Sequence, residues 1–215
     1  GEYMSGFTSM VRRDPIGVVA SIAPWNYPLM MGAWKIAPAI AAGNTMVLKP
    51  SEQTPLSTLF ISDLISNILP EGVVNIIHGV GETVGSTLIS HPDVNMISLT
   101  GDIATGSKVL EAASKSIKKT HLELGGKAPV IVFDDADIDD VVENVKAFGY
   151  YNAGQDCTAA CRVFADKKVY DKIVSGLTSA ASSIVLADSN DEKNEIPPLI
   201  TKEHFNRVSN FVESA

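Results

Sequence analysis

Hydrophobic positions between Ile16 and Ser114 alternate between two spacings. Short runs rich in strand-favouring residues lie at 16–23, 45–50, 73–79 and 95–100, and helical spacing fills 28–42, 54–69, 82–90 and 103–114. The helix at 54–69 is expected to have Thr54 as its cap and Pro55 at its first position. Strands that alternate with helices predict an α/β domain with a Rossmann-like parallel sheet covered on both faces.

A second α/β segment is expected after Gly125 and Gly126, which follow a short strand pattern at 120–124. Its strands are predicted at 128–133 and 161–169, its helices at 135–151 and 170–187, and a polar loop at 188–198. Three Asp residues in the first turns of the 135–151 helix complement its dipole. We therefore expect part of a cofactor-binding domain over 16–124 and part of a second, catalytic domain over 125–215.

Composition narrows the class of protein. The 215 residues are 45% hydrophobic and 20% charged, which is typical of a globular chain, and the net charge of -8 argues against a nucleic-acid or anionic-membrane partner. Cys157 and Cys161 form neither a disulfide framework nor a zinc site, so we expect no metal and a reducing, cytoplasmic location. The longest apolar run, 38–48, is broken by Gly43 and Asn44 and is too short to span a membrane.

The two ends of the sequence predict that it is part of a longer chain. It opens with "GEYMSGF", without an initiating Met, and it stops at "NFVESA", inside a helical pattern. A targeting signal at the true N-terminus would lie outside this sequence.

The loops after the predicted strands are the first places to look for a ligand, because α/β sheets bind ligands beyond the carboxyl ends of their strands. Residues 79–85 space their glycines as GxGxxxG rather than GxGxxG, which leaves dinucleotide binding and an ordinary turn both open. Lys49 and Glu52 form either a surface turn or a contact to the adenosine ribose. In the second case the carboxylate would repel a 2′-phosphate and favour NAD over NADP.

Cys157 is the candidate nucleophile, and the alternative is an inert buried thiol. The small residues at 158–160 favour a loop-to-helix transition that would direct backbone N–H groups at its sulfur. Cys161, one turn further, is expected to be a packing residue. No histidine pairs with Cys157 in the sequence pattern, which disfavours a protease-like mechanism. Asn26 either caps a helix or donates to an oxyanion, and Glu123 is an edge charge or, if buried, a general base.

Five motifs resemble those of the aldehyde dehydrogenase superfamily in order and spacing, over nearly the whole chain. They are "APWNYPLMMGAWK", "GNTMVLKPSEQTP", "LTGDIATG", "LELGGKAPVIVFDDADID" and "AGQDCTAACR". The stretch "FGYYNAGQDCTAACR" in particular resembles the γ-aminobutyraldehyde and betaine-aldehyde dehydrogenase branch.

The resemblance implies NAD-dependent oxidation of an aldehyde, with an ω-amino aldehyde as the expected substrate. Cys157 would attack the aldehyde carbon, Asn26 and the Cys157 N–H would stabilise the oxyanion, and hydride transfer to NAD would leave a thioester. Glu123 would activate the water that hydrolyses this thioester. The cofactor contacts implied by the resemblance are Ala23, Trp25, Lys49, Ser51, Glu52, Gly81, Gly85, Gly101, Asp102 and Thr105.

Two carboxylates need an explanation. Asp102 stands where the family commonly has Ser, and it would repel the cofactor's pyrophosphate unless it turns outward or caps the helix. Asp156, beside Cys157, disfavours the thiolate. Asp156 either faces the substrate tunnel or caps the helix that follows. In the tunnel it would receive the ammonium end of the substrate together with Tyr27, Trp34 and Tyr151.

The resemblance also implies assembly into a homodimer or homotetramer, with residues 1–15 as an exchanged arm strand and a small aldehyde as the other partner. The family's C-terminal "EIFGP" segment and the N-terminal part of its cofactor domain have no counterpart in this sequence, so an inactive isolated fragment is one expected outcome. Betaine aldehyde or a general aliphatic aldehyde is the alternative substrate. A non-catalytic protein on the same fold and an acyl-transferring cysteine enzyme stay open as alternative functions, although the second has no use for an adenosine site.

Overall fold

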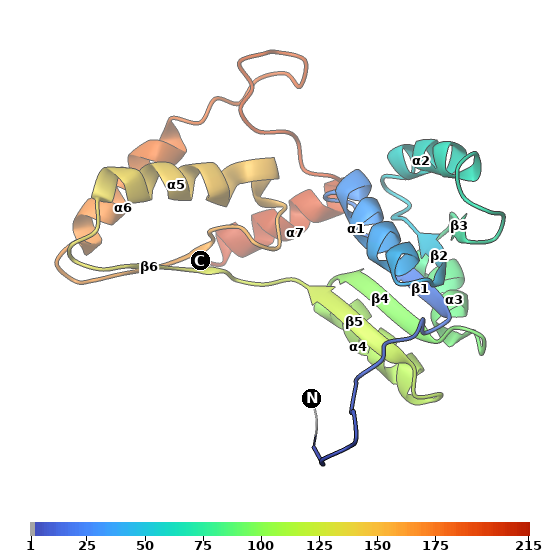
Figure 1. Cartoon of the computed structure of the whole chain (residues 1–215). Helices are drawn as coiled ribbons and strands as arrows, with labels where there is room; N and C mark the ends of the chain where they lie inside the picture. The colour runs from blue at the N-terminus through green and yellow to red at the C-terminus, as the bar shows by residue number, and fades with distance from the viewer. Residues whose placement is uncertain (1–2) are drawn as a thin grey trace. The chain divides into compact units, whose positions relative to one another are not determined.

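The computed structural model describes residues 3–215, which divide into two compact units (Figure 1). Within the described residues, unit 1 extends to residue 124 and unit 2 comprises residues 125–215. Each unit has its own parallel sheet and its own helices, which confirms the predicted α/β class.

Unit 1 is built on a five-stranded sheet in the order β3-β2-β1-β4-β5, and every neighbouring pair is parallel. The register places Val19 of β1 opposite Met46 of β2 and Met96 of β4. The chain moves outward in one direction from β1 to β3 and then crosses back to β4 and β5. The strands are β1 (Val18–Ile22), β2 (Thr45–Lys49), β3 (Val74–Ile76), β4 (Met96–Gly101) and β5 (Lys119–Leu124).

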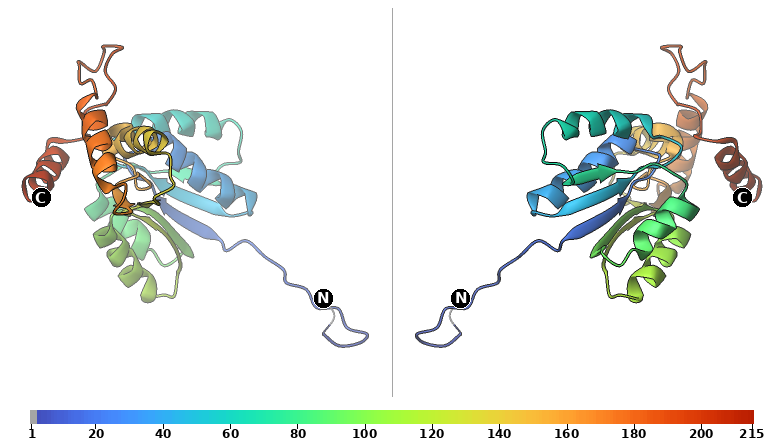
Figure 2. Two further views of the ribbon diagram at one scale, coloured as in Figure 1. Left: turned by 90° about the vertical axis from the view of Figure 1, so that its left-hand side faces the viewer. Right: turned by 90° about the vertical axis from the view of Figure 1, so that its right-hand side faces the viewer.

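Helices cover both faces of this sheet, because successive strand residues point to opposite sides (Figure 2). On one face Val19 and Leu48 pack with Met31 and Ile36 of α1, and α2 adds partly buried residues. On the other face Ala20, Ile97 and Leu99 pack with residues of α3 and α4. The helical elements are α1 (Pro28–Ala41), α2 (Leu56–Ser66), the π-helix η1 (Gly81–Gly85), α3 (Ser86–Ser90) and α4 (Ile103–Ser114).

The start of α2 differs from the prediction. The helix begins at Leu56 with Pro55 as its N-cap residue, and no side chain makes a capping bond there, so the predicted Thr54 cap is wrong. The backbone N–H of Thr54 instead donates to the Ser51 carbonyl at 3.2 Å. This bond closes a four-residue turn after β2, which keeps Thr54 out of the capping position.

Residues 3–15 contain no regular strand in the part of the chain that the structure describes. An antiparallel bridge joins Met4 and Phe7, and the side chains of Tyr3 and Val11 are almost fully exposed. The arm strand expected at 1–15 stays a prediction, because an exchanged strand would pair with another subunit; residues 1 and 2 lie outside the described part.

Unit 2 packs two helices on a two-stranded parallel sheet. Val132, Val169 and Ile173 form its buried centre, and Asp137 caps α5 by accepting from the N–H groups of Asp139 and Asp140. The predicted acidic helix start is confirmed. The elements are β6 (Pro129–Val132), α5 (Ile138–Tyr150), the 3₁₀ turn η2 (Tyr151–Gly154), β7 (Arg162–Ala165), α6 (Tyr170–Ser182) and α7 (Lys202–Glu213).

Candidate active site

The predicted cofactor residues of unit 1 gather at one edge of its sheet, where the carboxyl ends of the parallel strands lie together. The chain reverses its direction of travel between β1 and β4, and open α/β sheets bind ligands in the crevice beside such a switch point. The predicted residues that end β1, β2, β3 and β4 or follow them at this edge are Ala23, Trp25, Lys49, Ser51, Glu52, Gly81, Gly101, Asp102 and Thr105.

Lys49 and Glu52 form one contact at the end of β2. The Lys49 ammonium is buried and donates to the Pro50 carbonyl at 2.9 Å and to Glu52 Oε2 at 3.2 Å. Partial burial raises the pKa of the Glu52 carboxyl, but a bond from its own backbone N–H and the contact with Lys49 outweigh that effect, so its pKa is lower than usual. An ionised carboxylate with one exposed side can accept bonds from ribose hydroxyls, and it would repel a phosphate in the same place.

The glycines at 81 and 85 begin and end the π-helix η1, a rare element that is frequently found at functional sites. The position that a Cβ of Gly81 would take has no neighbouring atom within 4 Å, so the backbone there is open to a ligand. At Gly85 a Cβ would lie 3.8 Å from Cδ of Lys49, which places the buried lysine beside this glycine. Ser51, also buried, accepts a bond from the Gln53 N–H at 3.2 Å.

Asp102 caps helix α4, which is one of the two outcomes expected for it. Its Oδ1 accepts from the Thr105 N–H at 2.8 Å and its Oδ2 from the Thr105 hydroxyl at 3.1 Å. The cap explains why a carboxylate is tolerated, because it satisfies an N–H group that the first turn of a helix leaves unpaired. The Thr105 hydroxyl donates to this carboxylate, so both side chains are already engaged with each other.

Trp25, Asn26 and Tyr27 lie between the end of β1 and the start of α1 and are all half-buried. The N-cap residue of α1 is Tyr27, and no side chain makes a capping bond, so the reading of Asn26 as the helix cap is wrong. Tyr27 packs against the core cluster beneath α1, whereas Trp34, on the same helix, is exposed.

Glu123, the penultimate residue of β5, has an exposed side chain, 61% accessible, so burial does not prepare this carboxylate as a base. Its Oε1 lies 3.4 Å from Nε2 of His121. The other ring nitrogen of His121 lies 3.3 Å from Oγ of Ser98, and that hydroxyl accepts a bond from the buried Lys35 ammonium at 3.0 Å.

Lys35, Ser98 and His121 were missed in the sequence. The strand pattern at 120–124 offered one signal for His121, because side chains alternate between the two faces of a strand and residues 121 and 123 must therefore share a face. Lys35 stands inside an apolar helical pattern, and nothing local indicates that its ammonium is buried. Burial lowers the pKa of Lys35 to about 8, against the opposing effect of the Glu123 charge.

The loop around Cys157 differs from its prediction. The residues after Cys157 form a turn and then extended chain up to β7, so no helix N-terminus faces the sulfur. Tertiary contacts explain the difference, because the Ala160 N–H donates to the Phe148 carbonyl at 3.3 Å and ties this segment to α5. Cys157 is half-buried and Cys161 is exposed, which also corrects the expectation that Cys161 packs inside; neither forms a disulfide.

The segment 152–155, just before Cys157, is held by strained backbone and by the buried side-chain amide of Gln155. Asn152 and Ala153 have φ of 51° and 58°, a left-handed conformation that is costly for a residue with a Cβ such as Ala153. Gln155 is buried; its Nε2 donates to the Asn152 carbonyl at 3.0 Å and its Oε1 accepts from the Ile200 N–H at 2.9 Å. Strain that is held by specific bonds is typical of functional loops.

Asp156 turns its carboxylate toward Thr158. Oδ1 accepts from the Thr158 N–H and from its hydroxyl, both at 2.9 Å, so it closes a turn around Cys157 rather than capping a helix. Tyr151, at the start of η2, is exposed.

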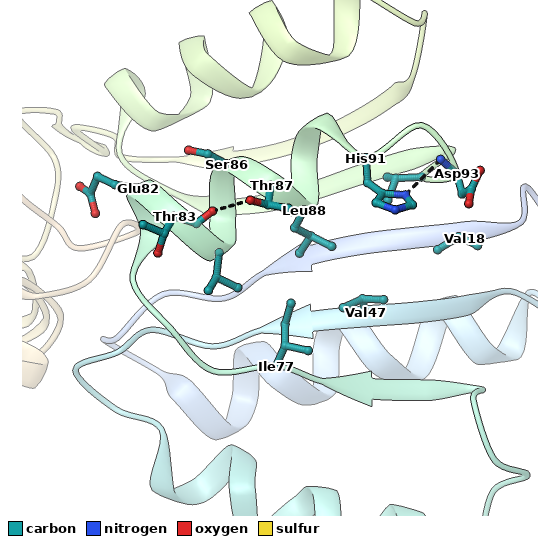
Figure 3. Close-up of a pocket in the computed structure, with 12 residues that line it drawn as sticks. Val18, Val47, Ile77, Glu82, Thr83, Ser86, Thr87, Leu88, His91 and Asp93 are labelled. Atoms are coloured by element: carbon teal, nitrogen blue, oxygen red, sulfur yellow. Dashed lines mark hydrogen bonds between the residues drawn. The ribbon is translucent and has the colours of Figure 1, made fainter.

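A cavity of about 720 Å³ lies on the α3 face of the unit 1 sheet, beside η1 (Figure 3). Apolar side chains of β1 and β2, among them Val18 and Val47, line it together with Thr87, Leu88 and His91 from the α3 region. Glu82, Thr83 and Val84, which lie between the predicted cofactor residues Gly81 and Gly85 in η1, also line it.

Comparison with protein families finds a match to the model described as "Aldehyde dehydrogenase family" over residues 2–215. Retinaldehyde dehydrogenase 3 of Mus musculus is 47% identical over 205 residues, which cover 94% of this chain and 40% of that protein. Betaine aldehyde dehydrogenase of Bacillus subtilis is 45% identical over 206 residues, covering 95% of this chain and 42% of that protein. This chain therefore spans about two-fifths of the length of these relatives.

Solved structures show the same similarity. Betaine aldehyde dehydrogenase from Staphylococcus aureus, in complex with NAD+, superimposes with a TM-score of 0.89 at 40% identity, covering 93% of this chain and 40% of that one. The aldehyde dehydrogenase from Bacillus cereus, also an NAD+ complex, has a TM-score of 0.90 at 39% identity and covers 94% of this chain and 41% of that one. Over residues 3–215, helices are all too short or too polar to cross a bilayer.

Proposed function

This chain belongs to the aldehyde dehydrogenase family, and from that premise we propose that the protein containing it oxidises an aldehyde to a carboxylic acid with NAD. The observation that carries the proposal is the family match across residues 2–215, a stretch that includes both Cys157 and Glu123. Because the chain spans only about two-fifths of its relatives, the activity belongs to the protein that contains it.

The residues at the carboxyl edge of unit 1 fit NAD as the cofactor. The ionised Glu52, held by buried Lys49, would accept the ribose hydroxyls, and the open backbone at Gly81 would lie against the nucleotide. The exposed side of that carboxylate disfavours the 2′-phosphate of NADP. When bound, NAD supplies the hydride acceptor. Proteins similar to this one have been crystallised with NAD+, which supports the same choice.

In this proposal three residues take part directly in the oxidation of the aldehyde and the hydrolysis of the thioester. Cys157 is the nucleophile that attacks the aldehyde carbon, and Asn26 donates its amide to the oxygen that becomes negative. Glu123 accepts a proton from the water that hydrolyses the thioester, a role for which its carboxylate is accessible. Asp156 uses one oxygen, Oδ1, to accept both hydrogen bonds of the turn around Cys157.

For the substrate we propose a cationic aldehyde, with an ω-amino aldehyde such as γ-aminobutyraldehyde first. The charge of Asp156, supported by the aromatic rings of Tyr27, Trp34 and Tyr151, would attract an ammonium group. Betaine aldehyde is the second candidate, and the similarity to the Bacillus subtilis and Staphylococcus aureus betaine aldehyde dehydrogenases favours it. Both substrates carry the positive charge on which this part of the proposal rests.

The test is NADH formation by the protein that contains this chain. γ-Aminobutyraldehyde, betaine aldehyde and an uncharged aldehyde of similar length are compared in the native protein and in Cys157→Ser. Turnover that Cys157→Ser abolishes is expected. Absence of NADH with every aldehyde would refute the function, whereas Cys157-dependent turnover without preference for charge would refute only the substrate class.

The charge of Asp156 is tested by Asp156→Asn, which keeps an oxygen for the turn and removes the charge. KM should rise several-fold for the two cationic aldehydes and stay unchanged for the uncharged one, since an exposed charge contributes about 1 kcal/mol. Asp166→Asn is the matched control, because Asp166 closes the same kind of turn by accepting from the Lys168 N–H at 2.8 Å. Equal changes for all three aldehydes would contradict the role of Asp156.

A further inference from the structure

Four side chains on the α1 face of the unit 1 sheet form a continuous polar row. Lys35 comes from α1, Ser98 from β4, and His121 and Glu123 from β5. The strand register explains the row, because Ser98 lies directly opposite His121, and residues 121 and 123 share one face of β5. The three steps along the row measure 3.0, 3.3 and 3.4 Å.

Lys35, at the start of the row, determines the direction of the hydrogen bonds along it. A lysine ammonium has donors and no acceptor, so Ser98 Oγ must accept from Lys35. The hydroxyl hydrogen of Ser98 is then available to donate to Nδ1 of His121. A neutral imidazole that accepts at Nδ1 carries its hydrogen on Nε2, and Nε2 is the nitrogen next to Glu123 Oε1.

We infer that His121 is a positioning residue for Glu123: with its hydrogen held on Nε2 by Ser98 and Lys35, it orients the carboxylate for its role as a base. This inference rests on the proposed function, in which Glu123 activates the water that hydrolyses the thioester. A hydrogen bond to the charged form of a carboxylate favours that form, and an exposed glutamate without such a partner would rotate freely.

The state of Lys35 adds a pH dependence. Its pKa of about 8 results from burial, which lowers it, and from the charge of Glu123, which opposes the shift. Below this pH the ammonium directs every bond toward Glu123. Above it, the neutral amine can accept from the Ser98 hydroxyl, the donor to Nδ1 is lost, and the tautomer of His121 is no longer fixed.

Other charged groups near α1 do not face this row. Lys49 of β2 points to the opposite face of the sheet, where it lies beside Gly85, and Asp63 of α2 is exposed. Lys119 is the third residue of the β5 face and lies beyond His121, with an exposed side chain. Lys35, His121 and Glu123 are thus the titratable groups that decide how the protonation of this row changes with pH.

The experiment follows hydrolysis of the acyl-enzyme directly. The protein containing this chain is mixed with NAD and labelled aldehyde, and acid quenching at successive times measures the label bound to Cys157. In His121→Ala the bound label should form at the native rate and disappear about tenfold more slowly, since positioned general bases contribute 10²–10⁴-fold and only part of that is removed. In the native protein the rate of hydrolysis should fall as the pH rises through about 8, where Lys35 loses its proton. In His121→Ala this fall should be absent.

Two further variants separate positioning from a merely structural role. Ser98→Ala should also remove the pH 8 decline, and adding it to His121→Ala should slow hydrolysis no further, because the two residues act through one contact. His121→Gln, whose amide can donate in place of Nε2, should recover part of the rate. Lys119→Gln, on the same strand face, is the control and should behave like the native protein.

Each outcome decides between the claims. Native hydrolysis and a native pH profile in His121→Ala would overturn the positioning role while the proposed function stands. Equal slowing in Lys119→Gln would overturn it too, because the effect would then be general to the strand face. If no label binds to the native protein at any time, the proposed function fails and this inference falls with it.

Discussion

Unit 1 and unit 2 hold their functional residues by different means. In unit 1 the site residues follow strands whose neighbours include fully buried side chains such as Met46, Leu48 and Leu99. In unit 2 the sheet has two strands, and Cys157 lies on a loop held by the Gln155 amide and by two left-handed residues. Packing therefore places the proposed cofactor residues, whereas hydrogen bonds and local strain hold the loop that carries Cys157, the proposed nucleophile.

The largest expected effect tests the packing half of this contrast. Leu99→Ala, in the centre of unit 1, should lower the opening free energy of β4 by about 2–5 kcal/mol, because it leaves a cavity in a densely packed layer. Ile173→Ala in unit 2 should cost toward the lower end of that range, since a thinner core can relax. Hydrogen exchange of peptides from each unit measures both. Equal or larger destabilisation by Ile173→Ala would break the contrast, and Leu110→Ala, at a half-exposed position of α4, is the control.

The second effect concerns the loop. Gln155→Ala removes the bonds to Asn152 and Ile200 and should destabilise the loop by about 1–3 kcal/mol, because it leaves buried backbone groups unpaired. Cys157 should then react faster with iodoacetamide in a Cys161→Ser background, as the loop opens more often. Gln53→Ala changes the chain's other glutamine, which is exposed, and should leave the thiol reactivity unchanged. An unchanged rate in Gln155→Ala would show that packing holds this loop after all.

A smaller effect sharpens the role of strain. Ala153→Gly should stabilise the loop by up to about 1 kcal/mol, because glycine adopts a φ of 58° without a steric penalty. The same substitution at Ala147, an exposed position inside α5, should destabilise by about the same amount. Hydrogen exchange of the two peptides compares them, and a loss of stability at both positions would mean that Ala153 is not strained.

The smallest effect lies at the cofactor edge. Asp102→Ser keeps a capping oxygen for α4 and removes a negative charge near the proposed pyrophosphate, so NAD should bind about two- to fivefold more tightly. Calorimetric titration of the protein that contains this chain measures the dissociation constant. Asp137→Ser, which changes the cap of α5 in unit 2, should not alter it. Weaker binding in Asp102→Ser would show that the carboxylate assists the cofactor.

The sequence predicts the strands and helices of unit 1 well because their signals are local. Alternating burial along β5 leaves a period of two in the residues themselves, and the three consecutive buried residues of β4 leave a short apolar run. The segment after Cys157 was wrongly predicted as a helix start because Thr158, Ala159 and Ala160 favour helix only when tertiary contacts are ignored. The bond from Ala160 to Phe148 and the left-handed Ala153 depend on residues brought together by folding.

Lys35, Ser98 and His121 illustrate the same limit at the site. They come from three elements; Lys35 and Ser98 are 63 residues apart along the chain, and Ser98 and His121 are 23 apart, so no short motif contains them. From the sequence, Glu123 alone could be proposed as the base. The partners that orient it require the register of two strands and the position of a helix above them.

The two faces of the six-residue strand β5 have different roles. One face packs in the core, and the other carries the residues proposed for the chemistry. Leu122 and Leu124 pack on the α4 side, and a Cβ on Gly106 would already meet Leu124 at 2.9 Å, so that face tolerates little change. His121 and Glu123 face the other way and are exposed. An engineer could therefore diversify positions 121 and 123 in a library while holding the leucines constant, and could select new reactivity without a matching loss of yield from misfolding.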